Sequence, residues 1–198
     1  MPRKKKITNR EEWLNAAALA MKPWLLDTEA GKEYEDPYIS VGFPKGSRGR
    51  NVSNAIGQCW DKSSSHDKQR AHIFIIPTMT KPVDILAVLL HELVHASVGN
   101  ECGHRGPFKS CAVELGLTGK MTATVPGPDL TSRLETLADK LGDYPHAGLK
   151  VPKRGSVGSR LLKVACPGCG CIIRMTQKWI DEIGCPTCGC GTDMELSQ

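Results

Sequence analysis

Two histidines and a glutamate within residues 91–95, His-Glu-Leu-Val-His, are the strongest chemical signal in the sequence. On an α-helix, residues four apart lie one turn apart on the same face, so the imidazoles of His91 and His95 can converge on one metal ion. Glu92 then projects to the side and serves as the base toward the water that the metal activates. The spacing is typical of zinc hydrolases and predicts peptide hydrolysis with Glu92 as the catalytic residue.

A third ligand is expected beyond this helix, because a catalytic zinc usually keeps three protein ligands and one open position. We expect His104, since Gly99 and Gly103 let the chain turn back toward the metal. Val98 stands where the HExxHxxGxxH pattern of metzincins requires glycine, and His104 comes later than the third histidine of that pattern.

Other interpretations of this segment stay open. Glu114 and, more weakly, Glu101 are rival third ligands, and Cys102 could approach the metal, although a packing role is favoured for it. The two helical histidines could also be core residues without a metal. The segment around them is strongly apolar, however, and ionisable groups are costly there without a metal or a partner. We therefore favour the metal site.

The cysteine-rich tail is the other strong signal, because CPGCGC at 166–171 recurs as CPTCGC at 185–190. Two CxxC pairs separated by fifteen residues are formed by Cys166, Cys169, Cys185 and Cys188. This spacing predicts a structural four-thiolate zinc site that supplies most of the stability of a small ribbon. Cys171 and Cys190 are expected to be spare thiols, with a disulfide between them as the alternative.

The elements predicted to position these histidines and cysteines are both helices and strands, so we expect an α+β fold. A capping box at Thr8 and Glu11 predicts a helix that ends near Met21, because Pro23 follows. Further helices are predicted over 82–98, 107–115 and 129–141. Extended runs at 38–43, 54–60 and 71–76 predict a small antiparallel sheet packed on these helices.

The chain is expected to divide into a metallopeptidase domain at 1–147, a basic linker at 148–163 and a zinc ribbon at 164–198. The net charge is +5, and basic residues without nearby acids cluster in RKKK at 3–6 and between 150 and 163. Such clusters attract nucleic-acid phosphates, although solvated tails that serve solubility are the alternative. The loop PKGSRGR at 44–50 is also basic.

Three residues of the ribbon could add to nucleic-acid binding. Arg174 and Lys178 could contact a phosphate backbone, and Trp179 could stack on a base. The favoured alternative is that Trp179 packs the ribbon against its neighbour. Nothing in the sequence predicts an oligomeric state.

No apolar run approaches the roughly 18 residues that span a bilayer, so no membrane partner is expected. The basic N-terminus is not followed by an apolar segment of the kind a signal peptide has. The nine cysteines are an odd number, and six lie within 166–190, which favours metal binding over disulfides. We therefore expect a cytoplasmic protein.

LLHELVHA at 89–96, GHRGPF at 103–108 and the CxxC ribbon after a basic linker resemble the SprT-like zinc metallopeptidases, which include the eukaryotic protease Spartan. The resemblance covers the chain from about Trp13 onward. It implies that His91, His95 and His104 bind a catalytic zinc, that Glu92 is the base, and that the substrates are proteins on DNA. Arg105 replaces a glycine that is frequent in the family.

The sequence leaves three candidate functions. The leading one is a zinc endopeptidase that its ribbon and linker bring to DNA, single- or double-stranded. The alternative is a nucleic-acid-binding or transcription-associated zinc protein without proteolytic activity. A hydrolase of non-peptide amides, such as cell-wall crosslinks, is a third.

Overall fold

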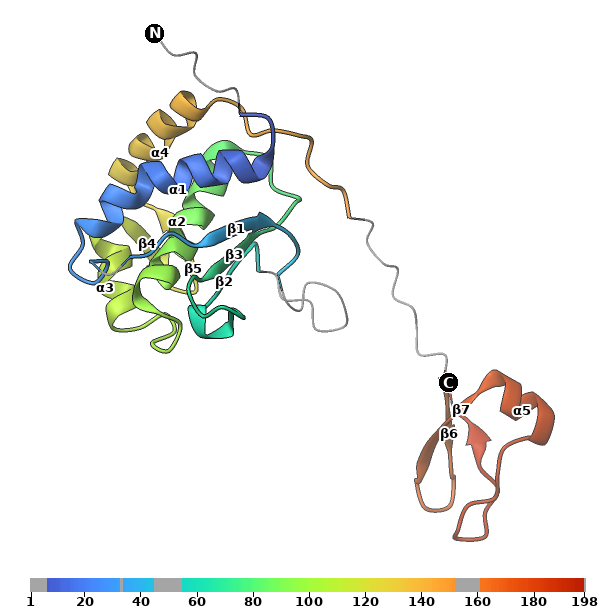
Figure 1. The fold of residues 1–198 in the computed structure, drawn as a ribbon. Coiled ribbons are helices and arrows are strands. Elements are labelled where there is room, and N and C mark those ends of the chain that lie inside the picture. Colours follow the sequence, from blue (N-terminus) through green and yellow to red (C-terminus); the bar gives the residue numbers. More distant parts are fainter. Residues whose placement is uncertain (1–6, 33, 45–54, 152–160, 198) are drawn as a thin grey trace. The chain divides into compact units, whose positions relative to one another are not determined.

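The structure is a computed structural model that describes residues 7–32, 34–44, 55–151 and 161–197. Contacts divide the chain into two units, Met1–Lys150 and Val151–Gln198. The first contains, in order, α1 (Arg10–Leu26), β1 (Tyr38–Val41), β2 (Gly57–Trp60), a short 3-10 helix (Lys62–Ser64), β3 (His72–Ile75), α2 (Pro82–Val98), α3 (Pro107–Glu114), β4 (Leu117–Lys120), β5 (Ala123–Pro126) and α4 (Pro128–Leu141). Figure 1 shows these elements in sequence colours.

The first unit is mixed α+β, as predicted, but its main sheet is not purely antiparallel. The strand order is β1-β3-β2, with β2 antiparallel and β1 parallel to the central β3. β1 and β2 are the two outer strands of this sheet. β3 lies between them and runs in the same direction as β1. The prediction of an antiparallel sheet is therefore wrong for β1, and within this sheet β2 and β3 form the antiparallel pair.

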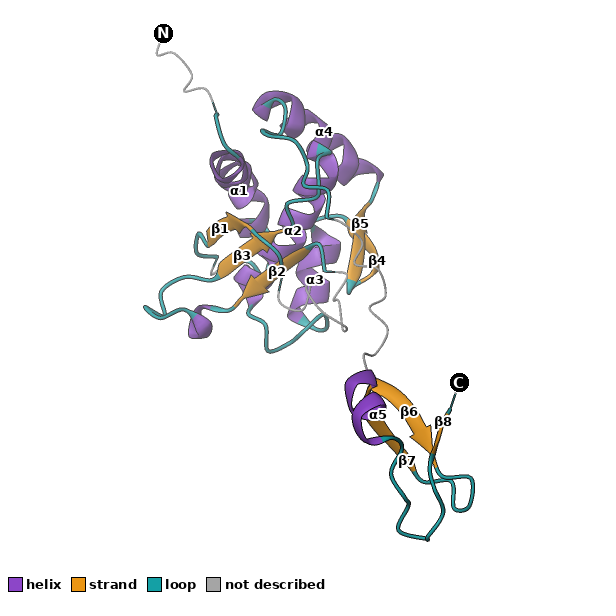
Figure 2. Cartoon of the chain, turned by 90° about the vertical axis from the view of Figure 1, so that its right-hand side faces the viewer, coloured by secondary structure: helices purple, strands orange, loops and turns teal. Residues whose placement is uncertain are grey.

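Helices pack on this sheet and on one another. α1 packs against β1, while α2 packs against β2 and β3, and α4 packs against both α1 and α2 (Figure 2). The core between them and α3 is apolar and includes the fully buried Trp13, Ile73, Leu89 and Phe108. α2 thus lies at the centre of the unit.

α1 differs from its prediction at both ends. Its cap is Asn9, whose side chain accepts a hydrogen bond from the Glu12 backbone N–H, and it continues past Pro23 to Leu26. Pro23 is exposed, so the backbone hydrogen bond that proline cannot make is lost on the solvent side. Leu25 on the opposite face is fully buried and keeps the last turn packed.

α2 has the bounds that the sequence predicts. Pro82 begins it, and Gly99 ends it with a φ of 78°. α3 and α4 begin or end within one residue of their predicted bounds. The β4–β5 hairpin was not predicted, because LTGKMTATVP contains glycine and lysine and lacks a clear apolar alternation.

The second unit contains β6 (Leu161–Ala165), β7 (Ile172–Thr176), α5 (Gln177–Ile183) and β8 (Glu195–Leu196) (Figure 2). Its strands have the order β7-β6-β8 and are antiparallel, over a small core of Val164, Cys166 and Met194. β6 begins inside the segment predicted as linker, of which 152–160 lie outside the described residues. α5 follows β7 directly, and the Thr176 side chain caps its first turn by accepting from the Trp179 N–H.

Within the described parts of the chain, no helix combines the length and apolar character needed to cross a membrane.

Candidate metal centres

The three histidines of the predicted site lie together. His104 Nε2 lies 3.2 Å from His95 Nε2 and 3.3 Å from His91 Nε2. Zinc–nitrogen bonds of about 2.0–2.1 Å in a tetrahedron place two ligand nitrogens about 3.3 Å apart. Both distances match the spacing around a tetrahedral metal ion, and the ligand atoms of all three histidines lie within 4.8 Å of one another, so the residues fit a metal.

Local structure explains this convergence. His91 and His95 lie one turn apart on α2, as their spacing predicts. His104 lies in the turn between α2 and α3, where Gly99 and Gly103 adopt φ angles of 78° and 54°. Side chains rarely tolerate these left-handed conformations, so the two glycines allow the chain to return to the helix, as expected.

Phe108 of α3 forms an apolar wall beside the three imidazoles. It is fully buried, and its ring centroid lies 5.0 Å from that of His91, 4.3 Å from His95 and 4.9 Å from His104. No motif predicts this role, because the contact depends on how α3 packs against α2.

Burial keeps the imidazoles neutral. It lowers the pKa of His91 to about 4, and the neighbouring His104 adds to the effect. The pKa of His95 falls to about 3 for the same main reason, and that of His104 is also lowered. A metal ligand must offer a free nitrogen lone pair, so the neutral rings are ready to bind near pH 7.

Glu92 is buried beside this group and is not one of its members. Burial raises the pKa of its carboxyl group to about 8, although a hydrogen bond from the Cys59 backbone opposes the shift. Cys59 belongs to β2, and its carbonyl accepts a 2.9 Å hydrogen bond from the Asn100 side chain. The backbone of Cys59 in β2 is thereby hydrogen-bonded both to Glu92 of α2 and to Asn100 in the turn that follows α2.

The rival third ligands point elsewhere. Glu114 accepts hydrogen bonds from the Glu29 backbone N–H at 3.2 Å and from Ser110 Oγ at 3.1 Å. Glu101 is exposed, and the Cys102 thiol lies 3.6 Å from backbone carbonyl oxygens of its own turn. None of them joins the histidine group.

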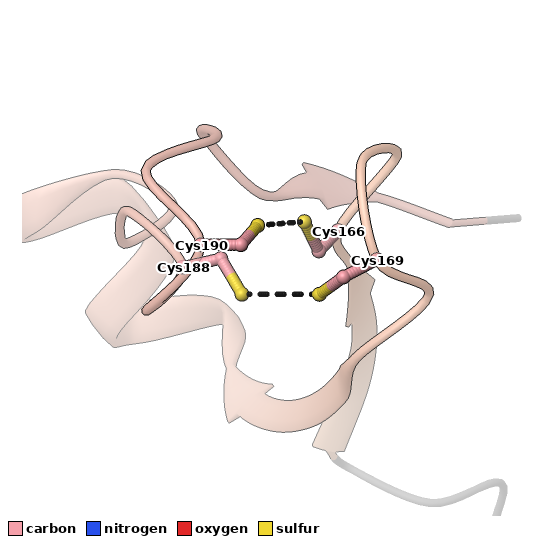
Figure 3. Close-up of side chains that lie close together, drawn as sticks. All are labelled: Cys166, Cys169, Cys188 and Cys190. Carbon is pink, nitrogen blue, oxygen red and sulfur yellow. Dashed lines mark hydrogen bonds between the residues drawn. The ribbon is translucent and has the colours of Figure 1, made fainter.

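Four thiols of the ribbon form a second group, drawn in Figure 3: Cys166, Cys169, Cys188 and Cys190. The sulfurs of Cys166 and Cys190 are 3.5 Å apart, as are those of Cys169 and Cys188. Zinc–sulfur bonds of about 2.3 Å place tetrahedral sulfurs about 3.8 Å apart, so this group also fits a metal ion.

The membership of this group differs from the prediction, because Cys190 replaces Cys185. In the first turn, the Cys166 N–H donates to the Cys171 carbonyl at 2.8 Å. In the second turn, the Cys188 N–H donates to the carbonyl of Thr192, four residues on, also at 2.8 Å. Backbone hydrogen bonds thus close turns that begin at Cys166 and at Cys188, whereas the repeat CPxCGC matches Cys185 with Cys166.

Of the basic segments expected to meet nucleic acid, at 3–6, 44–50 and 150–163, the residues 3–6, 45–50 and 152–160 lie outside the described part of the chain. In the ribbon, Trp179 is 49% exposed and does not belong to the small core. The Lys178 ammonium lies 5.3 Å from its ring centroid. The indole is therefore half exposed on the ribbon surface, with Lys178 over one of its faces.

Comparisons of this chain with known protein families, with curated proteins and with solved structures found no match. A functional proposal therefore rests on the side chains themselves and on the resemblance of their motifs.

Proposed function

We propose that this protein is a zinc-dependent endopeptidase of the SprT-like type that acts on proteins associated with or crosslinked to DNA. One observation carries the proposal: the buried carboxyl group of Glu92 lies beside three neutral imidazoles, and His104 Nε2 lies 3.2 Å and 3.3 Å from the Nε2 atoms of the other two. A metal site that serves only structure has no need of such a carboxylate.

His91, His95 and His104 would hold the catalytic zinc, which leaves the fourth tetrahedral position for water or substrate. A zinc ion in this site supplies a Lewis acid that polarises a substrate carbonyl and makes the attacking water more acidic. Glu92 accepts the proton of that water at its carboxylate and passes it to the leaving amine. A carboxyl pKa near the working pH suits both steps.

The backbone of β2 keeps this carboxylate in place. The Cys59 N–H donates to it, and β2 in turn is fixed by Asn100. A base that is already oriented avoids the entropy of ordering it during the reaction. In the second unit, a structural zinc held by four thiolates would stabilise the ribbon.

The nucleic-acid part of the proposal rests on sequence charge outside the ribbon. Between Leu161 and Ser197 the chain has three basic and four acidic residues, and bound thiolates add further negative charge. The basic residues at 3–6 and 150–160 are the better phosphate-binding segments. The ribbon contributes Trp179 as a stacking surface.

An intracellular, cytoplasmic location accords with the many free thiols.

Glu92→Gln tests the proposal. The amide keeps the size of the side chain but accepts no proton, so zinc content stays unchanged while cleavage of a loosely folded protein with DNA present falls about 10²- to 10⁴-fold. Glu101→Gln, in the exposed turn nearby, is the matched control and keeps full activity. If Glu92→Gln cleaves the substrate as fast as the wild type, Glu92 is not the catalytic base. Nucleic-acid binding by the wild type without any cleavage favours the non-proteolytic alternative.

A further inference from the structure

We propose that Thr124 of β5 is a positioning residue for the metal ligand His91, and that its hydroxyl group sets the affinity of the histidine site for zinc. This inference rests on the proposed function, because it assumes that the three histidines bind a metal. It concerns a hairpin that the sequence did not predict.

The two nitrogens of His91 face different partners. Nε2 faces His104 Nε2 at 3.3 Å, and Nδ1 lies 2.9 Å from Thr124 Oγ1. When the Nε2 lone pair faces a metal, the neutral ring carries its proton on Nδ1. The Nδ1–H group then donates to the Thr124 hydroxyl oxygen, which fixes both the tautomer and the rotation of the ring.

The hairpin holds Thr124 firmly. Thr124 lies opposite Gly119 in the β4–β5 pair, and β5 packs against α2 (Figure 2). β4 follows α3 after two residues, and β5 leads directly into α4. Across the base of the hairpin, the Gly127 N–H donates to the Gly116 carbonyl at 2.8 Å. The half-buried hydroxyl thus comes from a segment that is fixed at both ends.

His95, the buried histidine of the group, lacks such support. His95 Nδ1 is buried and has no hydrogen-bond partner among the described residues. The orientation of His95 depends on packing against Phe108, whereas that of His91 depends on a directional bond from outside α2. Outer hydrogen bonds of this kind typically change metal affinity about 10- to 100-fold when they are removed.

The test is the zinc affinity of the full chain, measured by competition with a chelator. Thr124→Val keeps the shape of the side chain and removes the hydroxyl, while Thr124→Ser restores the hydroxyl. Thr118→Val is the matched control, because the Thr118 hydroxyl on the partner strand donates to the Val125 carbonyl and is exposed. His104→Ala shows how much zinc the ribbon retains alone, so that the histidine site is obtained by difference.

We expect Thr124→Val to weaken zinc binding about 10-fold or more, and Thr124→Ser and Thr118→Val to stay within about threefold of the wild type. Wild-type affinity in Thr124→Val, or a loss in Thr124→Ser as large as that in Thr124→Val, overturns the inference. If Thr124→Val does not fold, Thr124→Ala is compared with Thr124→Ser by the same criterion. A wild type that binds no more zinc than His104→Ala instead refutes the proposed metal site itself.

Discussion

At the scale of single residues, glycine at position 57 decides where the carboxylate of Glu92 can lie. A Cβ atom at Gly57 would lie 2.6 Å from Glu92 Oε1 and 2.7 Å from Val88 Cγ1. Side-chain atoms do not approach so closely, so β2 can cover this part of α2 only without a side chain at that position. Glycine is needed here for close approach rather than for an unusual backbone angle.

Gly57→Ala should therefore move Glu92 while the histidines stay in place. We expect zinc content to be unchanged and the rate of proteolysis to fall at least about tenfold, because small displacements of a catalytic group are costly. The readouts are metal analysis and cleavage of a loosely folded protein. Gly42→Ala, whose Cβ would meet only the Phe74 ring at 3.3 Å, serves as control. Full activity in Gly57→Ala would mean that Glu92 does not need its observed position.

At the scale of elements, the second turn of the ribbon shows how backbone hydrogen bonds select among equivalent cysteines. The Gly191 N–H donates to the Cys188 carbonyl at 2.8 Å, which curls the chain around the sulfurs of Cys188 and Cys190. Cys185 precedes this turn and is half-buried next to the ribbon core. The repeated motif alone contains no information about which of these turns forms.

Two substitutions separate the alternatives for the ribbon. From the geometry we expect Cys190→Ser to lose the ribbon zinc and Cys185→Ser to keep it, since serine is a poor replacement for a thiolate ligand. Of these two variants, only Cys190→Ser should lower the zinc content from two ions per chain to one. The opposite pattern would show that Cys185 and Cys188, the CxxC pair that the spacing predicts, are the zinc ligands. His104→Ala, which removes zinc from the other unit, calibrates the loss of a single ion.

At the scale of the whole first unit, Arg10 connects the beginning of the domain to its end. Its buried guanidinium donates to the carbonyl oxygens of Pro77 at 2.8 Å, Pro145 at 2.9 Å and Ala147 at 2.9 Å. It also lies 4.8 Å from the ring centroid of Tyr144. Charge-assisted hydrogen bonds of this kind are strong, so α1 anchors the segment that leaves α4.

The buried phenol of Tyr144 predicts how stability changes at alkaline pH. Burial raises its pKa from 10.0 to about 12, although Arg10 opposes the shift. Between these two pH values the unfolded chain loses the phenolic proton and the folded chain retains it, so stability falls as pH rises through this window.

Tyr144→Phe should make this alkaline loss of stability smaller, as measured by urea unfolding at pH 7 and pH 11. Near pH 7 the variant should be at least as stable as the wild type, because the Tyr144 hydroxyl is buried without a hydrogen-bond partner in the described part of the chain and its removal ends a desolvation cost. Tyr34→Phe should act in the same direction, since burial also raises the pKa of Tyr34. A pH dependence identical to that of the wild type in both variants would contradict this account.

Local features of the sequence determined much of this protein. The four-residue spacing of His91 and His95 is enough to place two imidazoles on one face of a helix, and Gly99 and Gly103 permit the turn that returns His104. Pro82 and Gly99 likewise mark the two ends of α2. These outcomes depend on helical periodicity and on backbone conformations that neighbouring residues set by themselves.

Only the tertiary structure decided which distant groups meet. The parallel pairing of β1 with β3, the fit of Gly57 over Glu92 and the contact of Thr124 with His91 join segments far apart in the chain. The exchange of Cys185 for Cys190 depends on which backbone turn closes. Such contacts are set by packing and by long-range hydrogen bonds, and short motifs do not specify them.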